Sequence, residues 1–285
     1  MKHIMIILAA LAGALPAYSS VQISGRVLNG SRDSVGVAGV TVMLQKMAAG
    51  DMQDIDKLVS MSSGSFQFTV PSPDSGINYF ISSDHQGARY YSEAVAVETG
   101  SIRVPAQLVI FDSTHDNSAV QTMMHHVFVE DIGEGLAVRE MRIMHNPLSR
   151  TILNAIHDEH ETEAALRFLL PAAAQNVEAV GSHFDELAAH PPYLYYKGIL
   201  EPGNRQIGYV YNLAWHANEA ALDLHITQAT RSLDFFIANP DLVVQAEGVT
   251  DAGPFTIRNS TFRRYSAQNP RSEEHTSELQ SPNTN

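Results

Sequence analysis

Hydrophobic and polar residues alternate with a period of two along most of the chain. Val21, Ile23 and Val27 alternate with polar neighbours, and residues 66–70 (FQFTV) do the same. This alternation is typical of half-buried β-strands, because successive side chains of a strand point to opposite faces of the sheet. Turns rich in Gly, Pro, Asn and Ser separate such segments. The pattern therefore predicts an all-β protein.

The predicted strands form two series. The first comprises residues 21–27, 40–44, 66–70, 77–81, 88–91, 95–97, 102–104 and 108–110, and the second comprises residues 124–129, 136–144, 165–170, 193–199, 206–213, 222–226, 232–237 and 255–257. Short strands with regular turn signals indicate a β-sandwich. The polar segment 112–118 (DSTHDNS) separates the series, so we predict a β-sandwich at residues 20–112 and a second β-sandwich-like domain at residues 119–268.

One segment has a different period. Val177, Val180, Phe184 and Leu187 recur at spacings of three and four, which predicts a helix over residues 176–189, although Gly181 interrupts it.

Both ends of the chain carry processing signals. Residues 1–19 combine Lys2, an apolar run over residues 4–14 and small residues around Pro16. The run is too short to cross a bilayer, which needs about 20 apolar residues, and is typical of a signal peptide. We therefore predict an extracytoplasmic protein of the periplasm or cell envelope; a retained N-terminal anchor is the alternative. Residues 271–281 (RSEEHTSELQS) resemble a translated sequencing adapter, so residues 271–285 are expected to be an artefact and disordered.

Composition excludes several functions. The chain has 18 Lys and Arg against 31 Asp and Glu, a net charge of −13, so we expect no nucleic-acid binding. It has no cysteine, which excludes disulfides, thiolate zinc sites and cysteine nucleophiles. Its hydrophobic content of 44% is enough for a core in each domain.

Residues 21–111 resemble the carboxypeptidase regulatory-like family. The resemblance is carried by residues 24–27 (SGRV), 36–44 (GVAGVTVML) and 63–68 (SGSFQF). It implies an Ig-like, transthyretin/prealbumin-like β-sandwich of the kind appended to exported proteins and related to starch-binding modules. Peptidase activity is not implied, because fold and function separate freely.

Residues 119–266 resemble the second half of uncharacterised bacterial exported proteins with this same first domain. Residues 166–171 (LRFLLP), 200–207 (LEPGNRQI), 253–254 (GP) and 263–265 (RRY) carry the resemblance. Such proteins often end in a membrane helix. The resemblance therefore implies a membrane anchor beyond residue 270 that this sequence lacks.

Histidine clusters are the candidates for metal binding. Residues 157–161 (HDEHE) are the densest, and on a helix His157 and His160 would share one face. A third ligand is missing, so a solvated hairpin loop is the favoured interpretation, and we predict no metal or other cofactor. His125 and His126 are adjacent on a predicted strand and must point to opposite faces, so they cannot chelate one ion.

Motifs of catalysis are missing from the sequence. It contains no G-x-S-x-G nucleophile turn, H-E-x-x-H zinc helix, P-loop or calcium loop, and residues 133–135 (GEG) are typical of a hairpin turn. We therefore predict that the protein is not an enzyme.

Aromatic residues are the better candidates for binding. Tyr193, Tyr195 and Trp215 could stack on sugars if their rings were exposed and coplanar, but packing at a sheet edge or anchoring of a loop is the favoured interpretation. The sequence thus predicts a non-enzymatic structural or interaction protein of the cell envelope, with another envelope protein or a glycan as partner. A carbohydrate-binding module and a His-based metal-binding periplasmic protein are the alternative functions.

Overall fold

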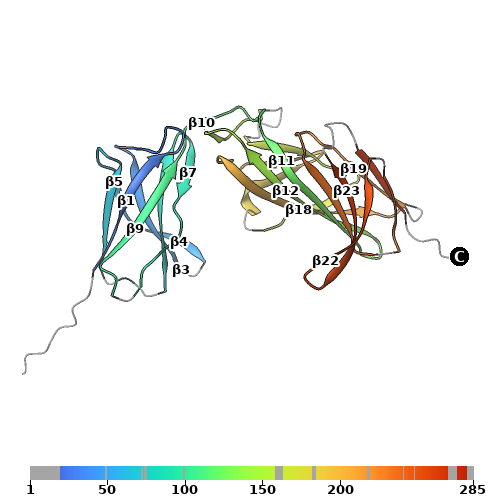
Figure 1. Ribbon diagram of the computed structural model, residues 1–285, viewed down its shortest axis with the longest axis horizontal. Coiled ribbons are helices and arrows are strands. Elements are labelled where there is room, and N and C mark those ends of the chain that lie inside the picture. Colours follow the sequence, from blue (N-terminus) through green and yellow to red (C-terminus); the bar gives the residue numbers. More distant parts are fainter. Residues whose placement is uncertain are drawn as a thin grey trace, which may run out of the picture. The chain divides into compact units, whose positions relative to one another are not determined.

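The protein is built almost entirely of β-strands, as a computed structural model shows (Figure 1). The structure describes residues 20–48, 50–71, 73, 76–98, 100–157, 163–181, 184–216, 219–239, 241–246, 248–268 and 275–280. In these residues one helical turn occurs, the 3-10 helix η1 (Phe184–Glu186), and no helix is long and apolar enough to cross a membrane. The all-β prediction is confirmed, and the predicted signal peptide lies outside the described residues.

The helix predicted over residues 176–189 is wrong. The structure gives strand β15 (Gln175–Ala179), then η1, then strand β16 (Leu187–His190). Gly181 has a φ of 104° and Asn176 a φ of 52°, and a right-handed helix admits neither value. Val177 and Leu187 both pack against the hydrophobic core, but they do so from two separate strands. Their helical spacing is therefore a coincidence.

Contacts divide the chain into two compact units. The first contains residues up to 29, 34–84 and 89–110, and the second contains residues 30–33, 85–88 and those from 111 onward. The segment 112–118, predicted to be the boundary, lies in the second unit. Its residues Ser113–Thr114 (β10) pair with Thr151–Ile152 (β13) in a parallel two-stranded sheet.

The first unit consists of two sheets with a common core. One sheet has the order β2-β1-β5 with β9 also beside β1, and its strands are β1 (Val21–Asn29), β2 (Val35–Gly36), β5 (Ser65–Val70) and β9 (Arg103–Ile110). The other has the order β4-β3-β6-β7 with β8 beside β6, and its strands are β3 (Thr41–Ala48), β4 (Asp51–Val59), β6 (Asn78–His85), β7 (Ala88–Tyr91) and β8 (Val95–Ala96). Inward-facing residues of both sheets, such as Ile23, Phe68, Leu44 and Ile81, are buried.

Gly25 allows strands β1 and β9 of the first sheet to lie close together. Strand β1 pairs in parallel with β9, and a Cβ at Gly25 would overlap the backbone oxygen of Ala106. A glycine is required there because the β9 backbone occupies the side-chain position.

A seven-stranded sheet organises the second unit. Its order is β15-β18-β12-β11-β20-β23-β22, with β11 (Gln121–Asp131), β12 (Gly135–Asn146), β18 (Gly203–Ala214), β20 (Ser232–Ile237), β22 (Thr250–Ile257) and β23 (Ser260–Gln268). Strands β11 and β12 form a hairpin around Gly133, as predicted. Strands β11 and β20 run parallel, whereas the other pairs of this sheet run antiparallel.

Two three-stranded sheets contribute to the same core. They are β14-β17-β16, with β14 (Leu166–Leu169) and β17 (Tyr193–Tyr196), and β19-β24-β21, with β19 (Glu219–Leu224), β21 (Val243–Ala246) and β24 (His275–Gln280). Phe168, Leu194 and Leu222 from these sheets pack with Val127 and Val138 of the large sheet in one buried cluster. The unit is thus a layered β-sandwich.

The C-terminal segment differs from the expectation of disorder. Residues 275–280 form β24, which pairs antiparallel with both β19 and β21. Strand β24 lies between β19 and β21, so it pairs with backbone groups that these two strands would otherwise expose at an edge. The adapter origin of this segment stays a prediction.

A carboxylate lies buried among the strands of the large sheet. Glu140 on β12 accepts hydrogen bonds from Tyr209 (2.7 Å) and Tyr211 (2.8 Å) of β18. His125 Nε2 of β11 and Arg142 Nη2 donate to Glu140 Oε2 at 2.7 Å and 2.8 Å. All five side chains are buried, and we call them the Glu140 network.

Charge within the Glu140 network is balanced by one anion and one cation. Burial alone would raise the pKa of Glu140, but Arg142 and the hydrogen bond from His125 hold that pKa below its usual range. Burial and the Arg142 charge lower the pKa of His125 to about 4, so its imidazole is neutral at pH 7. Burial raises the pKa of Tyr209 and of Tyr211, so both hydroxyls remain donors.

Replacing Glu140 with glutamine should strongly destabilise the fold. The Glu140→Gln variant leaves the Arg142 charge buried without its anion, and breaking a buried pair in this way costs about 3–5 kcal/mol. Urea unfolding of wild type and variant at neutral pH measures the difference. The matched control is Glu178→Gln on the exposed face of β15, for which we expect a change within about 0.5 kcal/mol. Equal effects of the two substitutions would contradict the buried ion pair.

Stability should decrease in mildly acidic solution. The pKa of His125 is about 4 in the folded protein, against an ordinary value of 6.5 that applies to the unfolded chain. As the pH falls between these two values, His125 is protonated in the unfolded chain but not in the folded protein. The free energy of unfolding should fall by about 2 kcal/mol between about pH 7 and pH 5. A His125→Gln variant, which cannot titrate, should lose this slope in urea titrations. Burial also lowers the pKa of His126, so the same titration of a His126→Gln variant measures how much of the decrease in unfolding free energy comes from His126.

Candidate functional site: an aromatic groove on the large sheet

Alternation along β11 sends neighbouring side chains to opposite faces of the large sheet. His125 is buried in the core-facing Glu140 network, whereas His126 lines hollows on the other face with Phe128. His125 and His126 thus point to opposite faces of the sheet, as the alternation predicted. The face that carries His126 and Phe128 is the outer face of the sheet, away from the core.

Five aromatic rings meet on this outer face. Phe128 and Phe236 stack at 4.8 Å between centroids with an interplanar angle of 15°. Phe262 meets both rings edge-on, at 5.8 Å and 6.2 Å, and His126 meets Phe236 edge-on at 5.1 Å. Phe255 is tilted against Phe236 at 5.5 Å. These contacts make one continuous cluster across four strands.

Strand register explains the alignment of the rings. Phe128 of β11 is the register partner of Phe236 of β20, through the parallel pair. Phe262 of β23 is the partner of Phe255 of β22, and β23 lies beside β20. Cross-strand partners on one face come within contact distance, so the rings assemble by backbone pairing.

Burial of the rings decreases toward the edge of the sheet. Phe236 is 2% exposed, Phe128 and Phe262 are half-buried, and Phe255 is 40% exposed. These rings are not part of the hydrophobic core cluster of the unit. The second unit therefore has a separate apolar cluster on the face opposite its core.

Two adjoining hollows flank the cluster. One, of about 580 Å³, lies between the outer face of β11, β12 and β18 and the turn of the β22–β23 hairpin; it is lined by Phe128, Ala137, Met141, Val210, Arg258 and Phe262 among others. The other, of about 650 Å³, is lined by Met124, Ile143, Phe236, Phe255 and Arg264 among others. His126 and Ile257 line both, so we treat the rings and both hollows as one feature, the aromatic groove.

Arginines give the aromatic groove a positive rim. The exposed residues Arg139, Arg231 and Arg258 line it, against one exposed carboxylate, Glu130. A second carboxylate, Asp234, is buried and paired with Arg264 at 2.9 Å. The whole chain has a net charge of −13, so this positively charged surface is opposite in sign to the chain as a whole.

His126 sits between these charges. Its Nε2 lies 3.7 Å from Asp234, and burial lowers its pKa although Asp234 acts in the opposite direction. The neutral imidazole adds a ring to the aromatic groove rather than a charge.

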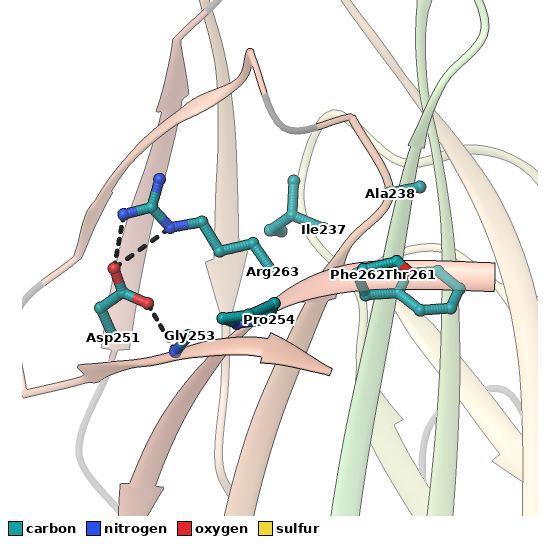
Figure 2. A pocket seen from close by; sticks show the side chains of 8 residues that line it. All are labelled: Ile237, Ala238, Asp251, Gly253, Pro254, Thr261, Phe262 and Arg263. Atoms are coloured by element: carbon teal, nitrogen blue, oxygen red, sulfur yellow. Dashed lines mark hydrogen bonds and ion pairs between the residues drawn. The ribbon is translucent and has the colours of Figure 1, made fainter. Parts of the chain in front are cut away.

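The opposite face of the β22–β23 hairpin is held by an ion pair (Figure 2). Arg263 donates through Nε and Nη2 to Asp251 Oδ2 at 3.1 Å and 2.6 Å, and the Gly253 amide donates to Asp251 Oδ1 at 2.9 Å. Arg263 and this amide hold the pKa of Asp251 below its usual range. A pocket of about 380 Å³ lies beside the pair, lined also by Pro254 and Phe262. The ion pair fixes the hairpin that carries Phe255 and Phe262 into the aromatic groove.

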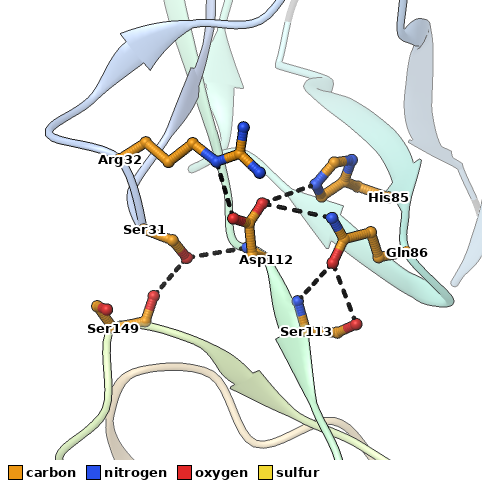
Figure 3. Close-up of polar contacts among 7 residues, drawn as sticks. All are labelled: Ser31, Arg32, His85, Gln86, Asp112, Ser113 and Ser149. Carbon is orange, nitrogen blue, oxygen red and sulfur yellow. Dashed lines mark hydrogen bonds and ion pairs between the residues drawn. The ribbon is translucent and has the colours of Figure 1, made fainter.

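A second polar cluster of this unit surrounds Asp112 (Figure 3). Arg32 donates to Asp112 Oδ2 at 2.9 Å, and the Asp112 amide donates to Ser31 Oγ at 2.9 Å. Gln86 Oε1 accepts from the amide of Ser113 at 2.8 Å. These bonds connect loops 30–33 and 85–88 to the start of β10, so we interpret the cluster as structural.

The aromatic residues predicted from sequence lie elsewhere and are differently placed. Tyr195 is buried, and Tyr193 is half-buried with the Arg167 guanidinium 4.4 Å from its ring centroid. The planes of Tyr193 and Tyr195 meet at 66°, and Trp215 packs half-buried against the core. These three residues therefore do not form the exposed coplanar rings that the carbohydrate prediction requires. Both tyrosines lie on β17, which belongs to a sheet that covers the core, and Trp215 packs against that core.

Of the predicted metal ligands, one is described. His157 is exposed, with its ring centroid 6.4 Å from that of His115. His160 lies outside the described residues. Among the residues that are described, no three His, Asp or Glu side chains gather as a metal site would require. Metal binding through His157 and His160 stays an alternative that these residues do not test.

The aromatic groove itself was not identified from the sequence. Its rings are those of residues 126, 128, 236, 255 and 262, and no local motif connects these positions. The available signal was that β11 and β20 each place a phenylalanine, Phe128 and Phe236, on the face opposite their buried aliphatic residues. Using that signal requires knowing that β11 and β20 pair in parallel.

An anionic aromatic dye should report the aromatic groove in the folded protein. Anilinonaphthalene sulfonate combines rings with a negative charge, and we expect it to fluoresce with wild type and less strongly with Phe255→Ala. Phe255 is 40% exposed, so its removal should leave the urea midpoint almost unchanged. Tyr91→Ala, which removes an exposed ring of the first unit, is the matched control. Dye binding that Phe255→Ala leaves intact would contradict this location.

Comparisons with known proteins give structural likenesses only. No family model matches the chain, and no curated protein matches it. It is similar to the full-length major pilin SpaD of Corynebacterium diphtheriae, with 11% identity, a TM-score of 0.25, and coverage of 92% of this chain and 82% of the pilin. Other similar structures are the major pilin SpaA of the same bacterium (9% identity, TM-score 0.23, coverage 71% and 61%) and the RrgB pilus protein of Streptococcus pneumoniae (10%, 0.22, 93% and 62%). At TM-scores this low they carry no argument about the function of this chain.

Proposed function

We propose that this chain is a non-enzymatic interaction protein of the cell envelope that binds a protein partner in the aromatic groove. The observation that carries this proposal is the ring cluster on the outer face of the large sheet. Clusters of aromatic side chains with arginines are the compositional mark of protein interfaces. The rings lie outside the hydrophobic core cluster of the unit, on the other face of the sheet.

Ring geometry favours protein side chains over sugars as the bound groups. Sugars stack on flat, exposed rings, whereas Phe262 and His126 meet Phe236 edge-on at 82° and 76°. The one stacked pair, Phe128 and Phe236, is buried or half-buried. A surface of ring edges and hollows instead suits branched and flexible apolar side chains.

Polar groups near the aromatic groove do not form a catalytic arrangement. His126 and Asp234 lie 3.7 Å apart, and Ser232 lines the same hollow. The Ser232 hydroxyl donates to the backbone oxygen of Met123 at 3.4 Å, so it is directed to the main chain. The Glu140 network is buried and lines neither hollow. Binding, rather than group transfer, is the chemistry that these contacts support.

The envelope location rests on the N-terminal sequence. Its short positive start, apolar run and small residues have the order of an export signal. We include a membrane anchor beyond residue 270 in the proposal, since the resemblance of residues 119–266 implies one.

A screen of displayed short peptides tests the binding function. The chain without its signal peptide should select peptides that combine acidic and apolar residues, because arginines and rings line the aromatic groove. Binding of these peptides to a variant with Phe255→Ala and Arg258→Glu should weaken by about tenfold or more. The control variant carries Tyr91→Ala and Arg150→Glu, which are exposed elsewhere. If no peptide distinguishes the two variants, the proposed function is wrong.

A further inference from the structure

The first unit has an exposed apolar surface on its β3–β4 hairpin. Large hydrophobic side chains with exposed fractions of 37% to 60% follow one another along the hairpin and the turn after it: Met47, Met52, Ile55, Val59 and Met61. These residues make up half of the large hydrophobic side chains that are exposed in the described part of the chain. Their concentration on one hairpin indicates an interaction surface rather than scattered exposure.

The same hairpin is acidic. Asp51, Asp54 and Asp56 are exposed on β4, against two cations of the hairpin, the exposed Lys57 on β4 and the half-buried Lys46 on β3. Asp54 accepts a hydrogen bond from Gln45 at 2.7 Å, and Asp56 accepts one from the Lys57 amide at 2.8 Å. Both carboxylates stay exposed, as does Asp51, so all three contribute negative charge to the surface. The hairpin therefore presents methionines and carboxylates together.

Strand β4 is an edge strand, but it is poorly suited to adding another strand. It is the terminal strand of the order β4-β3-β6-β7, and the register with β3 shifts between Leu44 and Gln45. The shift leaves Ile55 without a partner on β3, as in a β-bulge. Bulges and charges discourage backbone pairing at an edge. A partner would therefore bind the side chains of the hairpin.

The β3–β4 hairpin and the aromatic groove are complementary in chemistry. Thioether groups contact aromatic rings favourably, and the rings of His126, Phe128 and Phe262 line the groove. The exposed arginines of the groove oppose the hairpin's aspartates in charge. Two hairpins would repel each other through their carboxylates, and two grooves through their arginines. The charges therefore favour binding of a hairpin to a groove over binding between two hairpins or between two grooves.

We propose that the β3–β4 hairpin of one copy of this chain binds in the aromatic groove of a second copy. This inference rests on the proposed function, since it names the protein that the groove binds. Each copy has both surfaces, so each can donate a hairpin and accept another. Contacts between different surfaces of identical chains do not stop at a dimer unless a ring closes, so the assembly grows with concentration.

Charge reversal on each surface tests the inference. Sedimentation equilibrium of the chain without its signal peptide should show a mass that rises with concentration and falls with added salt. A hairpin variant with Asp51→Lys and Asp56→Lys should associate at least about tenfold more weakly, and so should a groove variant with Arg139→Glu and Arg258→Glu. Mixing the two variants should restore association, because lysines then meet glutamates and aspartates meet arginines.

Matched controls carry the same charge changes at exposed positions away from both surfaces. These are Glu93→Lys with Glu98→Lys, and Arg103→Glu with Arg150→Glu, and both should associate like wild type. Restored association in the mixture also shows that both variants are folded.

A wild-type chain that stays monomeric, or a mixture that fails to associate, overturns the inference. If the selected peptides still bind the groove in that case, the proposed function stands. If they do not, both proposals fail.

Discussion

A buried carboxylate determines the register of the central strands of the second unit. Glu140 is taken out of water and receives hydrogen bonds from three adjacent strands, β11, β12 and β18. Shifting any of these strands by one residue would turn its contribution to the outer face and leave a charge without partners. Because alternation couples the two faces, the same register places His126, Arg139 and Val210 outside. The geometry of the aromatic groove thus depends on hydrogen bonds made on the other side of the sheet.

Such a network specifies structure more than it stabilises it. Taking Glu140 and Arg142 out of water costs free energy, and well-packed apolar residues of similar volume often stabilise a core equally well. What apolar residues lack is directionality. Arg142 also stacks its guanidinium 4.7 Å from the Phe168 ring centroid, which connects the large sheet to β14. The network therefore aligns both layers of the sandwich.

Local alternation made the strands predictable, whereas the site depends on pairing between distant strands. The period of two identified most strands, and it placed His125 and His126 on opposite faces before any contact was known. The predicted helix failed because residues from β15 and β16 happened to share a helical spacing. Whether Tyr195 is exposed could not be decided from the sequence, because its strand series gave no indication that β17 would cover the core.

Glu140 and Arg142 could have been noticed from sequence alone, since they occupy core-facing positions between Val138 and Met144. The aromatic groove could not, because its rings meet only through the parallel pairing of β11 with β20.

That parallel pair also affects the order in which the protein folds. Strands β11 and β20 lie far apart in the sequence, with β12 to β19 between them, whereas β3 and β4 are joined by a short turn. Local hairpins close quickly, and pairing between distant strands is slow, because the loop between them must lose entropy first. In a chain synthesised from its N-terminus, the acidic hairpin is complete well before Phe236 reaches Phe128. The nascent chain therefore has its β3–β4 hairpin long before its aromatic groove has formed. Two chains at this stage lack the groove that a hairpin would bind, so they do not associate before synthesis is complete.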